Sequence, residues 1–408
     1  MVKQTITAIL LLFASTQFVL IFGRTSLTVD YAQFDFAVRL IQETARSGRS
    51  VILSPTSIST ALFTIYLAAN GETKQRLQKI LGGNAGEIEI QQYFAKLLAD
   101  VVGIKNNKHI LNIANRFYVR EGFSIKPSFP YILQSYYGEI LQNFNYEQRN
   151  DLAKELNSLV SSNTDKKITE MMTTTNVDLE TKVLVLNGIY FKGTWKEQFT
   201  WGAKSKFDIS RRETKEVMMM QLRAKLPYYE TLSLQLVKLP YIGDELEMVI
   251  ILPKMRFDLM NIREKMKGED LFNYIRKAYP TEVEVKLPKF KLKEELNLEH
   301  ALRRIGIMNF ISENSNLREL SDESVSISNV IHDASFEVDK EGTGTTAQTE
   351  FDYFDISIKY FQRFNADQPF LFFVVKNLQK EKQEENEKSD IGHQTILYAG
   401  QCGSFCSF

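Results

Sequence analysis

The ten residues Leu186–Trp195, LNGIYFKGTW, end an apolar run that begins at Val183. From Val183 to Phe191 the run contains no charged side chain, and most of its residues are aliphatic or aromatic. β-Branched and aromatic residues favour pleated structure, and a continuous apolar run of this length predicts a strand buried on both faces. The sequence therefore predicts a fully buried strand near the middle of the chain.

Helices dominate before this strand, and strands dominate after it. Apolar residues recur at helical spacing over residues 30–46, 55–69, 87–101, 127–137 and 151–161. Short apolar runs bounded by turn residues predict strands at residues 51–53, 234–239, 247–252, 282–291, 370–375 and 395–399. Early helices and late antiparallel strands define the α+β class, and no internal repeat or flexible linker divides the chain.

The composition excludes several classes of function. The 408 residues are 44% hydrophobic, and 50 basic residues balance 50 acidic ones. A packed globular body is expected, and the zero net charge gives nucleic acid or an anionic membrane no attractive field. The motifs HExxH, GxSxG and CxxC are absent, and the four histidines are widely scattered. We therefore expect no metal or other cofactor, and no nucleic-acid or membrane partner.

The N-terminus differs from this average. Lys3 precedes an apolar run from Ile6 to Phe22, which polar residues at 15–17 interrupt, and Gly23 follows. A basic start, an apolar stretch and a small residue form the pattern of a secretory signal peptide. The interruption leaves no clean span of about 20 apolar residues for a membrane anchor. We expect a signal peptide at residues 1–23, a single domain at residues 24–408 and a secreted, extracellular product.

Two features near the C-terminus stay open. Cys402 and Cys406 could close a small terminal loop or remain free thiols, because spacing alone does not decide. Residues 380–390, KEKQEENEKSD, carry eight charged side chains in eleven positions between two predicted strands. Charge of this density is typical of a solvated surface insertion, which we expect at about residues 378–392.

A period-two pattern starts at Gly342. Small, β-branched or aromatic side chains occupy the alternate positions Thr343, Thr345, Ala347, Thr349, Phe351 and Tyr353. The positions between them include Glu350 and Asp352. Such alternation predicts a strand with one face fit for a core and the other for solvent. Residues 342–347 also match a loose dinucleotide fingerprint, but a strand pattern follows where that fingerprint requires a helix.

Six motifs along the chain resemble those of the serpin family of protease inhibitors. They are Ser54–Ser59 (SPTSIS), Ile113–Arg116 (IANR), Leu186–Trp195, Leu239–Tyr241 (LPY), Leu287–Phe290 (LPKF) and Phe364–Phe373 (FNADQPFLFF). Each motif is weak alone, whereas their order makes the resemblance specific, and it covers nearly the whole chain after residue 23. It implies the serpin fold, in which helices pack on three mainly antiparallel β-sheets and display a reactive loop, here at about residues 340–363.

The resemblance makes the alternating segment the hinge of that loop. The hinge residues are Gly342, Thr343, Gly344, Thr345, Thr346 and Ala347. In the family the loop is bait for a serine or cysteine protease, which is trapped as an acyl-enzyme while the cleaved loop inserts into the main sheet. A face without charge suits insertion, so we expect an inhibitor and not an enzyme. The alternative is a non-inhibitory carrier or binding protein of the same fold.

The family's spacing places the scissile bond fourteen residues after the hinge glycine, between Ile356 and Ser357. Ile356 suits an elastase-like pocket. Counting back from the C-terminal motif favours Ile358–Lys359 instead. Phe354 would suit a chymotrypsin-like pocket, and Lys359 a trypsin-like one. We therefore expect an elastase- or chymotrypsin-like serine protease as partner, with a trypsin-like one as the alternative.

Other family positions are structural. The resemblance assigns Ser54, Thr56, Asn187 and His332 to the shutter, where hydrogen bonds hold the main sheet closed until the loop enters. It assigns Trp195 to the breach, where insertion begins. Residues 87–101 carry no basic stripe, so no heparin-type site is expected. We expect a monomer.

Overall fold

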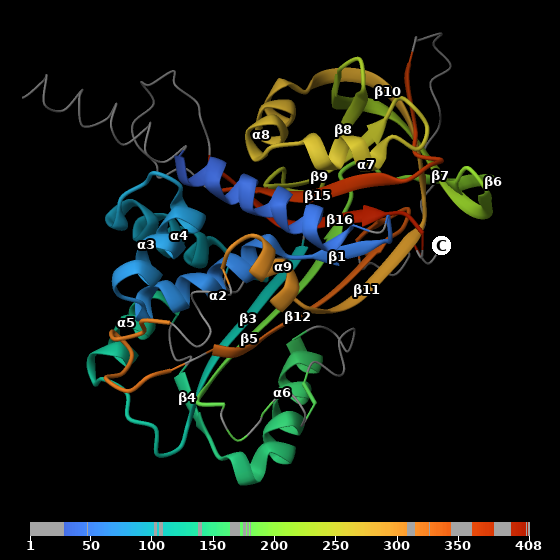
Figure 1. Cartoon of the computed structure of the whole chain (residues 1–408). Helices are drawn as coiled ribbons and strands as arrows, with labels where there is room; N and C mark the ends of the chain where they lie inside the picture. Colours follow the sequence, from blue (N-terminus) through green and yellow to red (C-terminus); the bar gives the residue numbers. More distant parts are fainter. Residues whose placement is uncertain are drawn as a thin grey trace, which may run out of the picture.

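The computed structural model describes residues 28–46, 48–101, 104–105, 109–137, 141–163, 172–173, 177, 179, 181–307, 315–325, 327–343, 361–378, 393–404 and 406. Figure 1 shows long strands running through the molecule, with helices α2–α5 grouped at one end and α7 and α8 near the other. The predicted α+β class is confirmed.

The five predicted helices are present among the described residues, together with five helical elements that the sequence patterns did not predict. In chain order these elements are a helix over residues 28–44, α2 (Pro55–Ala68), α3 (Gly71–Gly82), α4 (Glu87–Val101), α5 (Ser128–Tyr137), η1 (Tyr146–Gln148), α6 (Arg149–Asn163), α7 (Leu259–Lys265), α8 (Gly268–Lys277) and α9 (Glu299–Arg304). The unpredicted elements are α3, η1, α7, α8 and α9. Of these, α3 was missed because Asn70-Gly71 has the composition of a helix stop. In the structure Asn70 Oδ1 instead accepts a hydrogen bond from Gly71 N at 2.6 Å and caps a new helix.

A nine-stranded sheet contains most of the late strands. Its order is β1 (Val51–Leu53), β16 (Gln394–Cys402), β15 (Phe370–Asn377), β9 (Leu246–Pro253), β8 (Leu234–Pro240), β7 (Glu213–Glu230), β10 (Tyr279–Pro288) and β14 (Gln362–Asn365), with β6 (Thr200–Ser210) on β7. The long β7 pairs with β10 over most of its length and with β8 only at Tyr228–Glu230. Hydrogen bonding through β7 thus joins two of the three predicted sheets into one continuous path.

The second, seven-stranded sheet contains the run from which the fold was predicted. Its order is β11 (Phe290–Asn297), β12 (Ile327–Val338), β13 (Gly342–Thr343), β5 (Val183–Thr194), β3 (His109–Arg120) and β2 (Ile104–Lys105), with β4 (Leu141–Phe144) on β3. The predicted strand at 183–191 is β5, which pairs antiparallel with β3 on one side and parallel with β12 on the other. Both edges of β5 are therefore occupied.

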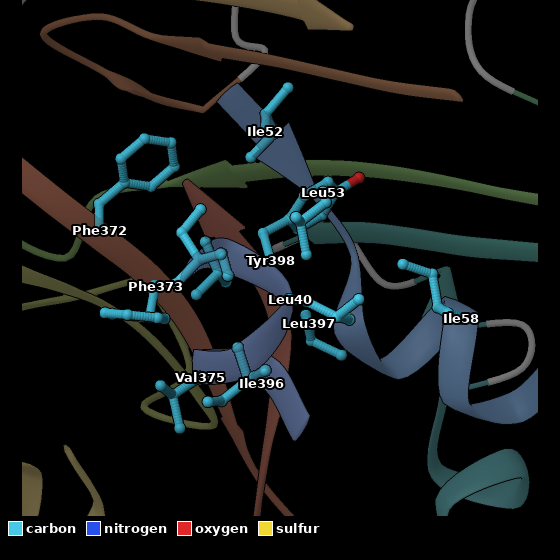
Figure 2. Packing of buried hydrophobic residues seen from close by; sticks show 14 of the residues in the cluster. Leu40, Ile52, Leu53, Ile58, Phe372, Phe373, Val375, Ile396, Leu397 and Tyr398 are labelled. Carbon is cyan, nitrogen blue, oxygen red and sulfur yellow. The ribbon is translucent and has the colours of Figure 1, made fainter. Parts of the chain in front are cut away.

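The main core lies where the helix over residues 28–44, β1, α2, β15 and β16 meet. Figure 2 shows Leu40, Ile52, Leu53, Ile58, Phe372, Phe373, Val375, Ile396, Leu397 and Tyr398 packed together there. Each is at most 2% exposed. Because burial of one such side chain contributes about 1.5–3 kcal/mol, this cluster fixes the C-terminal strands firmly.

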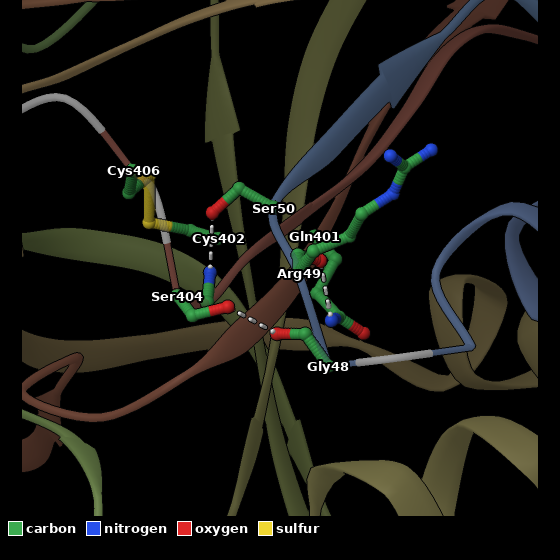
Figure 3. Close-up of a disulfide and its surroundings, with 8 residues drawn as sticks. Gly48, Arg49, Ser50, Gln401, Cys402, Ser404 and Cys406 are labelled. Carbon is green, nitrogen blue, oxygen red and sulfur yellow. Dashed lines mark hydrogen bonds between the residues drawn. A yellow bond between two sulfur atoms is a disulfide. The ribbon is translucent and has the colours of Figure 1, made fainter.

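The C-terminal segment is tied to the strand that opens the fold. Cys402 and Cys406 form a disulfide, which resolves the alternative left open by their spacing. Gly403 N donates to Ser50 Oγ at 2.9 Å, and Gln401 Nε2 donates to the Arg49 carbonyl at 2.9 Å (Figure 3). These bonds hold the end of β16 beside the start of β1.

Candidate functional site: the seam of the seven-stranded sheet

The strands β5 and β12 pair along only part of their length. Their parallel register runs from Ile327 opposite Val183 to Ala334 opposite Ile189. Beyond that point β13 lies between them, with Val338 opposite Thr343 on one side and Gly193 opposite Thr343 on the other. We call this line, with its closed part at 327–334 and its open end at β13, the seam.

Gly342 and Thr343 occupy the open end of the seam. Gly342 pairs with Thr194 of β5, and a Cβ built on Gly342 would lie 2.0 Å from the Gly193 carbonyl oxygen. Such contact with backbone leaves room only for glycine. Thr343 is 1% exposed, and its Oγ1 lies 2.7 Å from the hydroxyl oxygen of Tyr241. The first two residues of the predicted hinge are therefore inside the sheet.

A tight turn feeds the chain from β12 into β13. Asp339 N donates to the Gly342 carbonyl at 2.9 Å, while Asp339 Oδ1 accepts from the backbone nitrogens of Glu341 and Gly342 at 3.0 and 3.2 Å. Side-chain acceptance of this kind is how aspartate closes a turn. The turn reverses the chain, so β13 runs antiparallel to β12.

Trp195 covers this turn. Its indole Nε1 donates to the Asp339 carbonyl at 2.9 Å, and its backbone nitrogen donates to the Glu341 carbonyl at 2.9 Å. Its ring is 1% exposed and stacks on Tyr241 with ring centroids 4.5 Å apart. Burial raises the pKa of Tyr241, so its hydroxyl stays protonated and available to Thr343. Trp195 therefore holds the turn, and Tyr241, stacked on it, holds Thr343, the residue that follows the turn.

Ser54 and His332 meet at the closed part of the seam. The Ser54 backbone nitrogen donates to His332 Nε2 at 3.0 Å, which joins the start of α2 to β12. Because Nε2 accepts, the neutral ring carries its proton on Nδ1. Burial lowers the pKa of His332 to about 4, so the ring is neutral near pH 7. Within the described part of the chain, Nδ1 has no hydrogen-bond partner.

The two other predicted shutter residues lie at different places in the fold, Asn187 at the seam and Thr56 beside β16. Asn187 lies on β5 directly opposite His332 of β12. Thr56 Oγ1 donates to the Ile396 carbonyl at 2.7 Å and lies 2.9 Å from Thr395 Oγ1. Thr56 therefore ties α2 to β16 and makes no contact across the seam in these bonds.

Residues 344–360 of the predicted loop lie outside the described residues. This applies to the hinge residues Gly344, Thr345, Thr346 and Ala347 and to the scissile-bond candidates Phe354, Ile356, Ser357, Ile358 and Lys359. The predicted insertion at 378–392 and the signal peptide at 1–23 are also outside them, apart from Leu378. The described strand nearest the loop's distal end is β14, which pairs in parallel with β10.

Sequence reasoning missed Tyr241 as part of the site, and it did not find the turn that Asp339 closes. Tyr241 belongs to the LPY motif, but its partner Thr343 is 102 positions away, and no local pattern links the two. Asp339 closes the turn through its side-chain oxygen, and that turn exists only because β13 enters between β5 and β12. Among the described residues, no group of His, Cys, Asp and Glu could hold a metal, and no helix is long and apolar enough to cross a bilayer.

Comparison with known proteins identifies the family. Residues 31–381 match the family model described as serpin (serine protease inhibitor). The leukocyte elastase inhibitor of Equus caballus is 33% identical over 371 residues, covering 85% of this chain and 95% of that protein. Serpin B9 of Homo sapiens is 33% identical over 362 residues, covering 86% and 96%. The chain belongs to the serpin family.

Solved structures share the fold. Serpin48 of the insect Tenebrio molitor superposes with a TM-score of 0.75 at 24% identity, covering 92% of this chain and 97% of that one. Human thyroxine-binding globulin gives 0.78 at 20% identity, covering 92% and 98%. Because a binding protein shares this fold, the fold alone does not decide between inhibition and ligand binding.

Proposed function

We propose that this chain inhibits a serine protease as a suicide substrate and that Gly342–Thr343 are the first inserted residues of its reactive loop. The position of β13 between β5 and β12 carries the proposal. Both flanking strands pair with β13 in the antiparallel sense. A strand that continues from Thr343 would therefore also run antiparallel to both β5 and β12. Opening the seam would offer such a strand hydrogen-bond partners on both edges.

The alternation of the loop supports its insertion. Thr343 places its side chain in the core, and side chains two positions apart share a face of a strand. Thr345, Ala347, Thr349, Phe351 and Tyr353 would therefore follow Thr343 onto the buried face, and the acids Glu350 and Asp352 would face the other way. No charge would have to be buried during insertion.

The shutter and breach residues would then control the two ends of the seam. The Ser54–His332 hydrogen bond and the register that places Asn187 opposite His332 would hold the closed part. Trp195, through its bond to the Asp339 carbonyl, would hold the turn from which insertion starts. We assign these residues positioning roles in inhibition.

The chemistry belongs to the protease. Its serine hydroxyl would attack the carbonyl carbon of Ile356, and the peptide bond to Ser357 would break as that nitrogen leaves with a proton. The ester to Ile356 would remain when the freed loop enters the seam. The distorted protease could not hydrolyse this ester, because hydrolysis of an acyl-enzyme requires an intact oxyanion hole and a correctly placed general base.

The target class rests on residue type and on relatives. Ile356 has the size and apolar character that an elastase-like pocket accepts, and one relative is named leukocyte elastase inhibitor.

The proposal that the protein is secreted rests on the pattern of residues 1–23, in which a basic residue, an apolar stretch and a small residue follow one another. Sequencing the N-terminus of protein recovered from the medium of expressing cells tests this proposal, and a retained Met1 would overturn it.

The second candidate is a binding protein of the same fold without inhibition. The likeness to human thyroxine-binding globulin keeps this candidate open. A binding protein would form no covalent complex with a protease, whereas a suicide inhibitor would.

Incubation with elastase, chymotrypsin and trypsin, followed by denaturing electrophoresis, separates the two. We expect a covalent complex with elastase or chymotrypsin and none with the same protease inactivated at its serine. Mass spectrometry should find a released C-terminal peptide that begins at Ser357. Cleavage without any complex would support the binding protein, and a peptide with a different start would reject the proposed bond alone.

A further inference from the structure

A cavity of about 560 Å³ is built from α7, the segment that follows the helix over residues 28–44, the end of β6 with the turn after it, the residue before β15 and the end of β16. Its lining residues are Arg46, Gly48, Ile209, Ser210, Arg211, Arg212, Phe257, Leu259, Met260, Arg263, Pro369 and Gln401. We call it the α7 cavity. Its size is within the usual range of small-ligand sites.

Arg263 of α7 is the unusual member of this lining. It is 1% exposed, and its Nη1 donates to the Ala45 carbonyl and to Gln401 Oε1, the latter at 2.8 Å. Figure 3 shows Gln401 held in turn by its bond to the Arg49 carbonyl. Nε and Nη2 of Arg263 have no partner among the described residues. A buried guanidinium with unmet donors is costly, and an anion would satisfy it.

The charge of the lining favours an anion as well. Among the described residues that line the cavity, four are arginines and none is an acid. Arg46 is already paired with Glu43, whereas Arg211 lies over the Phe257 ring, 5.5 Å from its centroid. Guanidinium groups match the planar, two-oxygen geometry of a carboxylate.

Other residues of the lining are apolar. Met260 is 53% exposed although it is hydrophobic, and it lies in the same helix as buried Leu259. Phe257 has a φ of 66°, which is rare for an aromatic residue, and its backbone nitrogen donates to Gln368 Oε1 at 3.1 Å. Backbone held in this region is over-represented at ligand sites.

We propose that the α7 cavity binds a small amphipathic carboxylate, with the carboxylate at Arg263 and an aliphatic chain along Phe257, Leu259 and Met260. None of these residues takes part in the seam or the hinge. The inference therefore stands whether or not the chain inhibits a protease.

Calorimetric titration of the full-length protein with octanoate tests the site. We expect octanoate to bind, and octylammonium, 1-octanol and acetate to bind at least about tenfold more weakly. The first two of these lack the negative charge, and acetate lacks the long aliphatic chain. Equal binding of octanoate and 1-octanol would overturn the role of the arginines. Absence of octanoate binding at millimolar concentration would overturn the site itself.

Two variants place the ligand. Met260→Glu puts a carboxylate at the exposed mouth and should weaken octanoate binding about tenfold by like-charge repulsion. Met255→Glu is its matched control, because Met255 is 69% exposed and does not line the cavity. Arg263→Gln should weaken binding further. Equal octanoate affinity in the Met260 and Met255 variants would contradict the placement without any question of misfolding, since both side chains are exposed.

Discussion

At position 342 the space between β5 and β12 admits only a hydrogen atom. The Gly193 carbonyl oxygen lies 2.0 Å, and the Thr194 Cα 2.7 Å, from where a Cβ would be. Both neighbours are backbone, so neither can rotate away. Gly342→Ala should therefore lower the free energy of unfolding by about 1–3 kcal/mol, or withdraw the hinge from the sheet.

Urea unfolding combined with hydrogen exchange at the Thr343 amide distinguishes these outcomes for Gly342→Ala. Gly86→Ala is the control, because the nearest atom to its Cβ is 3.9 Å away. If Gly342→Ala matches the wild type in both measurements, β13 does not occupy the seam as described.

His332 makes the closed part of the seam sensitive to acid. Burial lowers its pKa to about 4 from 6.5, so the unfolded chain binds the proton more readily than the folded one. Keeping His332 neutral therefore costs no stability above pH 6.5. As the pH falls from 6.5 toward 4, the free energy of unfolding decreases, by about 2 kcal/mol at pH 5. Protonation would also remove the acceptor of the Ser54 N–H.

Unfolding free energies at pH 7.5 and pH 5 measure this effect. His332→Asn should flatten the difference by about 2 kcal/mol, whereas the same change at exposed His300 should leave it intact. An undiminished pH dependence in His332→Asn would show that other groups carry it.

Among the elements, most of those predicted have a local pattern of their own, although the amphipathic helix α8 was missed. The apolar run of β5, the Ser54-Pro55 start of α2 and the apolar spacing of α4 depend on neighbouring residues alone. By contrast, β12 and β3 gain their hydrogen bonds from β5, and β7 keeps 18 residues extended through three different partners. The strand pattern after Gly342 was visible in the sequence, but not that Gly342–Thr343 lie in the sheet.

The period-two face of the loop gives the prediction for this element. Thr343→Arg would bury a charge beside Tyr241 and should stall insertion at a cost of several kcal/mol. Inhibition should change to simple cleavage of the loop, seen as product without covalent complex on denaturing gels. Glu350→Arg is the matched control, because that position falls on the opposite face. Equal complex formation by both variants would contradict the assignment of faces.

For the whole molecule, the family and fold could be predicted from the order of six motifs, and both are confirmed. The joining of two predicted sheets through β7, the turn at Asp339 and the pairing of Thr343 with Tyr241 could not. Each depends on residues brought together across many strands. The α7 cavity was also invisible, because its arginines come from separate segments of the chain.

The central claim is that the seam is built to accept the loop as a further strand. Thermal unfolding of the intact protein, compared with protein nicked once in the loop between residues 344 and 360, tests it directly. Insertion would add a strand with both edges paired, so the account predicts that the nicked protein unfolds at a clearly higher temperature. An unfolding temperature that is unchanged or lower after the nick would contradict the account.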